Sequence, residues 1–509
     1  MLKHQNTNKM KTSCYLAIIV GICLFSSCRQ SQERAVFNRE ALLYHYTLPE
    51  DSLKKQAISF IINNISTHYS DIPVFTNRLT GREMSLDLTA IENKSILLQI
   101  IEQHHLDISF RSVPDTTIVS NTFLLQGLEQ AFRLWNKYPW ADQVPFEIFL
   151  NYLLPYKVHG EKPADWRTFF INKFKPYIQA LLHNNDLEIS LQCTNDIYYH
   201  FIVYFLWQWF EYTSTPTLLT RYPSFDELMV MQSGDCYGGA YLNVMALRSL
   251  GIPTALDFVP MWGRRNAGHY SEVFWDNEQR RFRTASGREF RFPAKVFRYT
   301  FRQQNNWSAF IQPVVQHNPF LLDFLKHDHW MDVTHEHTVT ATVEYEWEFT
   351  SDFAYICVLN YGRWMPIFWG KVEDGKARFE NMGTDMLYRI AVPFGASYKP
   401  ISSIFHVDET GSKTFFKPNP NERINLRLSR LNTGARSWIR AGRNYSLFYY
   451  DGNGDWNLFD IQQAESDSLI VFENVPSNTL YWLWNIESDR RYRRLERPFL
   501  YENGVQIFY

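Results

Sequence analysis

Apolar residues recur at helical spacing along much of the first half of the chain. From Asp51 they fall on one face of an amphipathic helix, at Leu53, Ala57, Ile58, Ile61, Ile62 and Ile65. Residues 121–138 and 166–182 show the same pattern, and the aromatic-rich stretch 198–212 also has helical spacing. These segments predict a helical N-terminal region over 41–214.

The pattern changes to strict alternation from about Thr338. Apolar side chains at every second position from Val339 to Phe349 predict a strand with one exposed face. A Phe-Glu-Asn triplet and a tyrosine that follows it occur twice, 93 residues apart, at Phe379 and Tyr388 and again at Phe472 and Tyr481. A repeat of this length predicts two consecutive antiparallel β-sandwich domains, over 331–430 and 431–509.

Between these regions lies the segment with the clearest candidate chemistry. An apolar run from Tyr237 to Leu250 follows Gly-Asp-Cys236 and ends at Gly251, which predicts a helix with Cys236 in its first turn. The unpaired N–H groups and the positive dipole end of a helix start favour a thiolate, so Cys236 is a candidate nucleophile. His269 begins a later alternating segment, a predicted strand, and is the candidate base.

The strand that begins at His269 is followed by a turn cluster and a second short apolar stretch, which predicts a hairpin. Folding the chain about residues 277–278 would bring the stretch from Thr284 to Ser286 opposite His269. A catalytic imidazole needs a partner that fixes its orientation, and no acidic residue stands in that stretch. Thr284 and Ser286 are therefore the third-position candidates.

A cysteine on a helix is followed by a histidine on a strand. This order, together with the sequence around both residues, resembles the transglutaminase-like superfamily and its papain-like Cys/His core. The chain is similar to transglutaminase-domain lipoproteins of Bacteroidetes, in the segments Gly234-Asp-Cys236, Leu247-Arg-Ser-Leu-Gly251-Ile-Pro253, Asp257-Phe-Val-Pro-Met-Trp262-Gly and Gly268-His269. The resemblance implies an α+β core over 215–330 with Cys236 as nucleophile and His269 as base. That family places a carboxylate about fifteen residues beyond the histidine, where this chain has Thr284; Asp257 and Asp276 stay open as alternatives.

The first residues have the features of an export signal. Lys9 and Lys11 precede an apolar stretch, 17–25, that is too short to span a bilayer. Small residues then lead to Cys28, which resembles a bacterial lipoprotein signal. The resemblance implies that residues 1–27 are removed, that Cys28 carries the lipid and that 28–40 is a tether. We therefore expect an outer-membrane lipoprotein of the cell envelope, periplasmic or surface-exposed.

The charge and the cysteine content limit the kinds of partner and cofactor that we expect. The 51 basic and 53 acidic residues nearly cancel, so electrostatics gives no reason to expect nucleic acid as a partner. An odd number of cysteines remains after Cys28, and we expect Cys193 and Cys357 to be buried packing residues. No pair or trio of the remaining cysteines has zinc-ligand spacing. The calcium-like stretch 451–457 lacks the glutamate of such loops at position twelve. We expect neither a metal nor another cofactor, and we predict that 451–457 is a hairpin turn.

Together these features predict a multidomain α+β protein anchored to the membrane through Cys28. Its predicted activity is hydrolysis, or transamidation, of amide bonds in a peptide, protein or peptidoglycan substrate through a thioester on Cys236. The alternative is a catalytically degenerate scaffold or a surface lipoprotein that binds a glycan or a protein, which the aromatic content of 17% also suits. Four polar residues of the helical region are secondary site candidates: His68, Glu147, Glu161 and Arg167.

Overall fold

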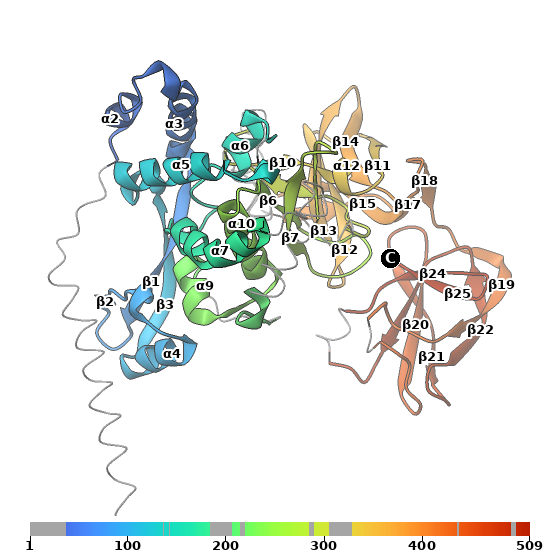
Figure 1. Cartoon of the computed structure of the whole chain (residues 1–509). Coiled ribbons are helices and arrows are strands. Elements are labelled where there is room, and N and C mark those ends of the chain that lie inside the picture. The colour runs from blue at the N-terminus through green and yellow to red at the C-terminus, as the bar shows by residue number, and fades with distance from the viewer. Residues whose placement is uncertain are drawn as a thin grey trace, which may run out of the picture. The chain divides into compact units, whose positions relative to one another are not determined.

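The computed structural model describes residues 37–183, 206–213, 219–284, 290–304, 328–489 and 495–509, apart from 136, 142, 396, 435 and 436 (Figure 1). The predicted signal, most of the tether, Cys28, Cys193 and Ser286 lie outside these residues. The described chain mixes helices with antiparallel sheets, which confirms the α+β class. It divides into two compact units, one of residues 1–256, 271–285 and 299–303 and the other of 257–270, 286–298 and 304–509.

The first unit holds most of the helices. Its α-helices are α2 (Arg39–Leu43), α3 (Ser52–Asn64), α4 (Lys94–Gln103), α5 (Asn121–Trp135), α6 (Phe146–Tyr152), α7 (Trp166–His183), α9 (Phe225–Met231) and α10 (Cys236–Ser249). Single 3-10 turns are η1 (Pro49–Asp51), η2 (Ile65–Thr67), η3 (Leu88–Ala90), η4 (Asp115–Thr117), η5 (Pro139–Ala141) and η7 (Leu206–Gln208). α3, α5 and α7 confirm three of the predicted helices.

Two parts of the predicted helical region are not helical. β1 (Tyr69–Asn77), β2 (Glu83–Met84) and β3 (Leu106–Pro114) form an antiparallel sheet in the order β2-β1-β3, with β1 and β3 paired along their whole length. β-Branched residues are frequent in both long strands, at Ile72, Val74, Thr76, Ile108 and Val113, and favour this pairing. In the stretch 198–212, the described part contains η7 and then β4 (Glu211–Tyr212) instead of a helix.

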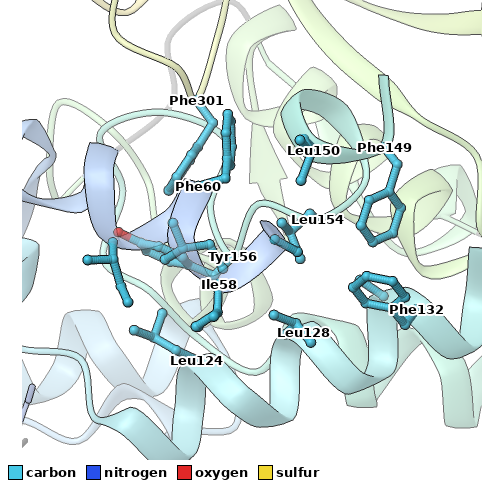
Figure 2. Packing of buried hydrophobic residues seen from close by; sticks show 14 of the residues in the cluster. Ile58, Phe60, Leu124, Leu128, Phe132, Phe149, Leu150, Leu154, Tyr156 and Phe301 are labelled. Carbon is cyan, nitrogen blue, oxygen red and sulfur yellow. The ribbon is translucent and has the colours of Figure 1, made fainter. Parts of the chain in front are cut away.

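The helices of the first unit enclose an apolar core that orders the segment before the candidate site. Ile58 of α3 belongs to the same cluster as Leu124 and Leu128 of α5. Phe60 packs beside Phe301, and Phe132 packs beside Phe149 of α6 (Figure 2). Leu124, Leu128 and Phe132 recur every four residues, so α5 turns one continuous face to the cluster. The members from α6 and beyond are Phe149, Leu150, Leu153, Leu154, Tyr156 and Phe301.

α10 is buried along almost its whole length and packs against α7. Arg167 of α7, itself buried, donates to the carbonyls of Leu153 (2.9 Å) and Arg248 (3.4 Å). Three of the four secondary site candidates have such structural contacts. Arg167 bonds the carbonyls just named, and the His68 ring lies within hydrogen-bond distance of the Phe301 carbonyl. Glu161 accepts hydrogen bonds from the amides of Val158 and His159. The fourth, Glu147, is an exposed partner of Arg302.

A five-stranded sheet follows α10 in the chain. Its order is β10 (Trp330–Asp332), β9 (Phe297–Tyr299), β6 (Thr254–Val259), β7 (His269–Asp276) and β8 (Arg281–Arg283). β7 and β8 form the predicted hairpin. Upstream of α10, β5 (Ser233–Gly234) pairs in parallel with β4.

In the second unit, every regular element described after Thr340 is a strand, as the change of period predicts. One sheet joins β11 (Thr340–Glu346), β14 (Lys376–Gly383), β13 (Arg363–Glu373), β12 (Phe353–Asn360), β15 (Met386–Phe394), β17 (Phe405–Val407) and β18 (Lys413–Phe415) in that order, with β16 (Ser397–Pro400) beside β15. β19 (Asn419–Leu428) pairs with β22 (Ile470–Ser477). A five-stranded sheet has the order β21 (Trp456–Gln463), β20 (Asn444–Tyr450), β23 (Tyr481–Asn485), β24 (Phe499–Glu502) and β25 (Val505–Phe508); the short α12 (Thr334–His337) precedes β11.

The sequence repeat has the same local structure in both copies. Tyr388 and Tyr481 each donate a 2.6 Å hydrogen bond to the carbonyl five residues earlier, of Gly383 and Pro476. The asparagines of the two Phe-Glu-Asn triplets both take a left-handed conformation, with φ of 55° and 57°. A tyrosine that ties its strand to the preceding corner recurs in β-sandwiches, so the repeat is a structural device and not a site.

The calcium-like stretch is a turn between β20 and β21. One carboxylate oxygen of Asp451 accepts from the backbone amides of Asn453, Gly454 and Asp455. This use of an aspartate oxygen is typical of tight turns. The hairpin prediction for 451–457 is confirmed.

Replacing Tyr388 or Tyr481 with phenylalanine should lower the free energy of unfolding by about 1 to 2 kcal/mol, because each change leaves a carbonyl without its hydrogen-bond donor. Urea denaturation followed by tryptophan fluorescence measures the loss. Tyr361→Phe, at an exposed position, is the matched control and should have almost no effect. Equal stability of all three variants would contradict the structural role of the repeat.

Candidate active site

The candidate nucleophile stands at the start of α10, as predicted. Asp235 is the N-cap, and its carboxylate accepts from the amides of Tyr237 (3.0 Å) and Gly238 (3.2 Å). Cys236 is the first helical residue and is half-buried, whereas every later residue of α10 to Ser249 is buried. The helix therefore offers one accessible side chain, a thiol, at the end where a negative charge is favoured.

The backbone before Cys236 is packed closely. A Cβ atom on Gly234 would lie 2.8 Å from the Phe210 ring, so only glycine fits there without a shift. The parallel pairing of β4 and β5 brings Tyr212 level with Gly234, one residue before the cap. Burial raises the pKa of Tyr212, and the charges of Cys236 and Asp235 raise it further. Tyr212 is thus a neighbour of the nucleophile that the sequence pattern, read as helical, did not reveal.

The candidate base is the first residue of β7 and is half-buried. The His269 ring lies between two aromatic neighbours, near-parallel to Trp262 (6.0 Å between centroids, 26°) and edge-on to Phe290 (5.8 Å, 89°). Burial lowers the pKa of His269, and the nearby guanidinium of Arg265 lowers it further. His269 is therefore a neutral imidazole at pH 7, the form that can accept a proton.

Glycine is required immediately before this histidine. A Cβ atom on Gly268 would lie 2.5 Å from the Pro260 carbonyl oxygen and 2.6 Å from that of Val259. The backbone at the end of β6 and the backbone entering β7 thus approach more closely than any other residue allows. The Gly-His pair seen in the sequence has this steric origin.

The two acids considered as orienters of His269 are engaged elsewhere. Both carboxylate oxygens of the buried Asp257 accept from Arg298, at 2.7 and 2.8 Å, and His337 lies 2.7 Å away. Asp276 accepts from the amides of Glu278 and Gln279 and so closes the β7–β8 turn. Among the residues that the structure describes, neither acid is bonded to His269.

The hairpin register differs from the expected one. Phe274 pairs with Arg283 and Asp276 with Arg281, so the turn is centred one residue later than predicted. Thr284 comes level with Val273, about 13 Å along β7 from His269 at the usual rise per residue. This register does not favour Thr284 as the orienting residue, while Ser286 lies outside the described residues and its role stays a prediction.

A second histidine, which the sequence pattern did not single out, lies behind the Phe290 ring. His337 stacks on Phe290 at 4.7 Å and 27°, and Phe290 in turn contacts His269. His337 is buried and held by Asp257, itself paired with Arg298. This buried ion-pair cluster fixes the wall behind the candidate base, and its members are too far apart in the sequence for any spacing to reveal it.

The loop that leads into His269 is held by the last residues of the chain. Arg497 is buried and donates to the carbonyls of Gly263 (2.8 Å), Leu359 (2.5 Å) and Tyr509 (2.5 Å) and to the Asn266 side chain (3.2 Å). Burial lowers the pKa of Arg497 to about 9, so the side chain stays charged at pH 7. One guanidinium therefore joins the histidine loop, β12 and the C-terminal residue.

Further bonds fix the same loop. Arg264 pairs with Asp385 at 2.6 Å and donates to the Phe508 carbonyl at 2.9 Å. Asn266 accepts from the Tyr361 amide, and the Asn360 side chain donates to the Ala267 carbonyl. The segment from Gly263 to Ala267 is thus held by side chains of the C-terminal β region at several points.

Cys236 lies in the first unit and His269 in the second, and their pairing as nucleophile and base stays a prediction. No protein-family model matches the chain, and no curated protein matches it. Within the described residues, no helix is long and apolar enough to cross a membrane. The same residues contain no group of three or more potential metal ligands.

The pKa of His269 should lie below its ordinary value of 6.5. The folded protein then binds this proton less readily than the unfolded chain does, so the contribution of His269 to stability is complete above about pH 6.5 and decreases as the pH falls towards the folded-state pKa. An NMR pH titration of the histidine rings, with His269→Asn for assignment, measures the pKa. A value at or above 6.5 would contradict the burial argument.

Arg497→Met should loosen the histidine loop, because four oxygens lose their common donor. Hydrogen–deuterium exchange should accelerate in peptides covering residues 260–268. Arg443→Met, which removes an exposed arginine paired with Glu487, is the control and should leave that exchange unchanged. Loop exchange that is the same in both variants would show that Arg497 does not hold the loop.

Proposed function

We propose that the chain is a lipid-anchored cell-envelope protein whose transglutaminase-like core cleaves amide bonds through a thioester on Cys236. The observation that carries the proposal is the start of α10, where Cys236 is half-buried and heads a helix that is otherwise buried. A core cysteine needs no such position, whereas a nucleophile needs both exposure and the helix dipole.

The proposed reaction begins with proton transfer from the Cys236 thiol to the neutral imidazole of His269. The sulfur attacks the amide carbonyl carbon, and the C–N bond breaks as the imidazolium returns the proton to the leaving amine. Water, deprotonated by His269, then attacks the thioester, releasing the acid and the thiol. An amine in place of water gives transamidation.

Backbone amides near the start of α10 are the proposed oxyanion donors. The Cys236 amide, in the first turn of α10, is the candidate donor that the family resemblance implies. Tyr212, exposed beside the cap, is a candidate second donor because its raised pKa keeps the hydroxyl protonated. The backbone assignment follows from the family resemblance, and Tyr212 is added because of its position beside the cap.

The finer domain layout belongs to the same proposal. We assign 41–214 to an N-terminal region that is mainly helical, 215–330 to the transglutaminase-like core and 331–430 and 431–509 to two β-sandwich domains. The common geometry of Tyr388 and Tyr481 supports the pairing of the last two. The expected lipid on Cys28 would place the protein at the outer membrane, with a peptide, protein or peptidoglycan substrate.

A binding scaffold is the second candidate function. It is favoured by the outer face of β20, β21 and β23, where Phe448 and Trp484 pack together at 4.5 Å and where Leu458 and Ile461 are about half exposed. Aromatic faces of this kind suit the flat side of a sugar ring or an apolar protein surface. A scaffold of this type requires no reactive thiol, so the reactivity of Cys236 separates the two functions.

Iodoacetamide at pH 7 should label Cys236 selectively, because it is accessible and at a helix start. Cys357 is the internal control: it is fully buried, and burial raises the pKa of its thiol. We expect Cys236 to react about tenfold faster than a simple thiol such as glutathione, given a favoured thiolate. Peptide-resolved mass spectrometry follows both sites. A Cys236 that reacts only after denaturation would favour the scaffold.

Cys236→Ala should abolish hydrolysis of peptidoglycan stem peptides or protein amides while changing stability by less than about 0.5 kcal/mol, as for a residue with little packing. Asp235→Ala is the contrasting variant. It removes the N-cap and should cost about 1 kcal/mol. Activity that survives in Cys236→Ala, or a large loss of stability there, would identify Cys236 as a packing residue.

A further inference from the structure

Arg265 projects from the histidine loop and rests on a fixed aromatic ring. Its guanidinium carbon lies 3.9 Å from the centroid of the Trp262 ring, while the Arg265 side chain is exposed. Trp262 is only 3% exposed, and its amide donates to the Ala267 carbonyl across the loop. A guanidinium stacked on a buried indole is held in one plane, with its N–H edge left to face a ligand.

Other arginines close to this loop in the sequence or in space already have partners. Arg264 pairs with Asp385, Arg298 pairs with Asp257 and Glu336, and Arg497 donates to three carbonyls and an amide. Arg265, by contrast, has no carboxylate and no hydrogen-bond acceptor within the described part of the chain. An exposed guanidinium that is held in one plane and has no counter-ion among the described residues is available to an anion from solution.

The position of Arg265 links it to the candidate base. The rings of His269 and Trp262 are near-parallel, and the same Trp262 ring carries the guanidinium. The two groups are close enough for the positive charge to disfavour the imidazolium. An anion bound to Arg265 would therefore lie beside the group that receives the proton.

We propose that Arg265 binds a carboxylate of the substrate next to the amide bond that is cleaved, so that the enzyme selects peptides with a free carboxylate near the scissile bond. This inference rests on the proposed function. A guanidinium edge and a carboxylate form two parallel N–H···O bonds, which fix orientation as well as position. The carboxylate can be a chain terminus or an acidic side chain; both present the same chemistry.

The first test uses small carboxylates and the His269 ring as reporter. N-acetylglycine carries a terminal carboxylate, N-acetylglutamic acid α-amide a side-chain carboxylate, and N-acetylglycinamide none. Binding neutralises the guanidinium, so a carboxylate should raise the His269 pKa in a saturable way, and the neutral compound should not. The anion that binds more tightly shows whether the substrate carboxylate is a chain terminus or an acidic side chain. No shift with either anion would overturn the proposal.

Arg265→Gln should abolish that response and by itself raise the His269 pKa part of the way, since burial remains. Arg440→Gln, at an exposed arginine of the second unit, should keep the wild-type response. A response that persists in Arg265→Gln would place the anion elsewhere and contradict the assignment.

The second test compares two alkylating agents of nearly equal size, iodoacetate and iodoacetamide, at Cys236. The rate with iodoacetate divided by the rate with iodoacetamide should fall roughly fivefold in Arg265→Gln, because only the anionic reagent is attracted by the guanidinium. Labelling at an unchanged ratio would refute the role of Arg265 and leave the Cys236 chemistry intact. Labelling by neither reagent would instead contradict the proposed function, and with it the claim that the carboxylate belongs to a substrate.

Discussion

The candidate base depends on one buried charge, the guanidinium of Arg497. Removing such a group from water is costly unless its N–H groups find acceptors, and here three carbonyls and the Asn266 side chain accept four hydrogen bonds from it. These acceptors come from the loop before His269, from β12 and from the final residue of the chain. The β-rich C-terminal part therefore has a structural role at the candidate site, since it fixes the backbone from which His269 extends.

Electrostatics around the two candidate residues is consistent with a thiol that reacts at neutral pH. The start of α10 favours negative charge at Cys236, while burial and Arg265 disfavour positive charge on His269. Asp257, one of the two acids considered as partners of His269, is committed to Arg298 and His337. A neutral imidazole without a bonded carboxylate can still take a proton, but it stabilises the resulting imidazolium less well than a triad does.

Patterns that act over a few residues were readable from the sequence. The helix that begins at Cys236 and the strand at His269 follow from local spacing, and the paired tyrosines Tyr388 and Tyr481 follow from a repeat of 93 residues. The β1–β3 sheet, the one-residue shift of the β7–β8 turn and the Asp257–Arg298–His337 cluster did not. The sheet and the cluster are set by contacts between segments distant in the chain, and the turn is set by which amides Asp276 accepts from. The spacing of residues along the sequence does not show which distant segments come into contact in the fold.

The central claim is that His269 activates Cys236, and the pH dependence of Cys236 alkylation by iodoacetamide in wild type and His269→Phe tests it most directly. The account predicts that the wild-type rate rises with a midpoint below pH 6.5, the ordinary histidine value, and is high at pH 7. In His269→Phe the rise should move up towards the ordinary thiol range, about pH 8.5, and stop short of it because the helix start still favours the thiolate. Identical profiles in the two proteins would contradict the account.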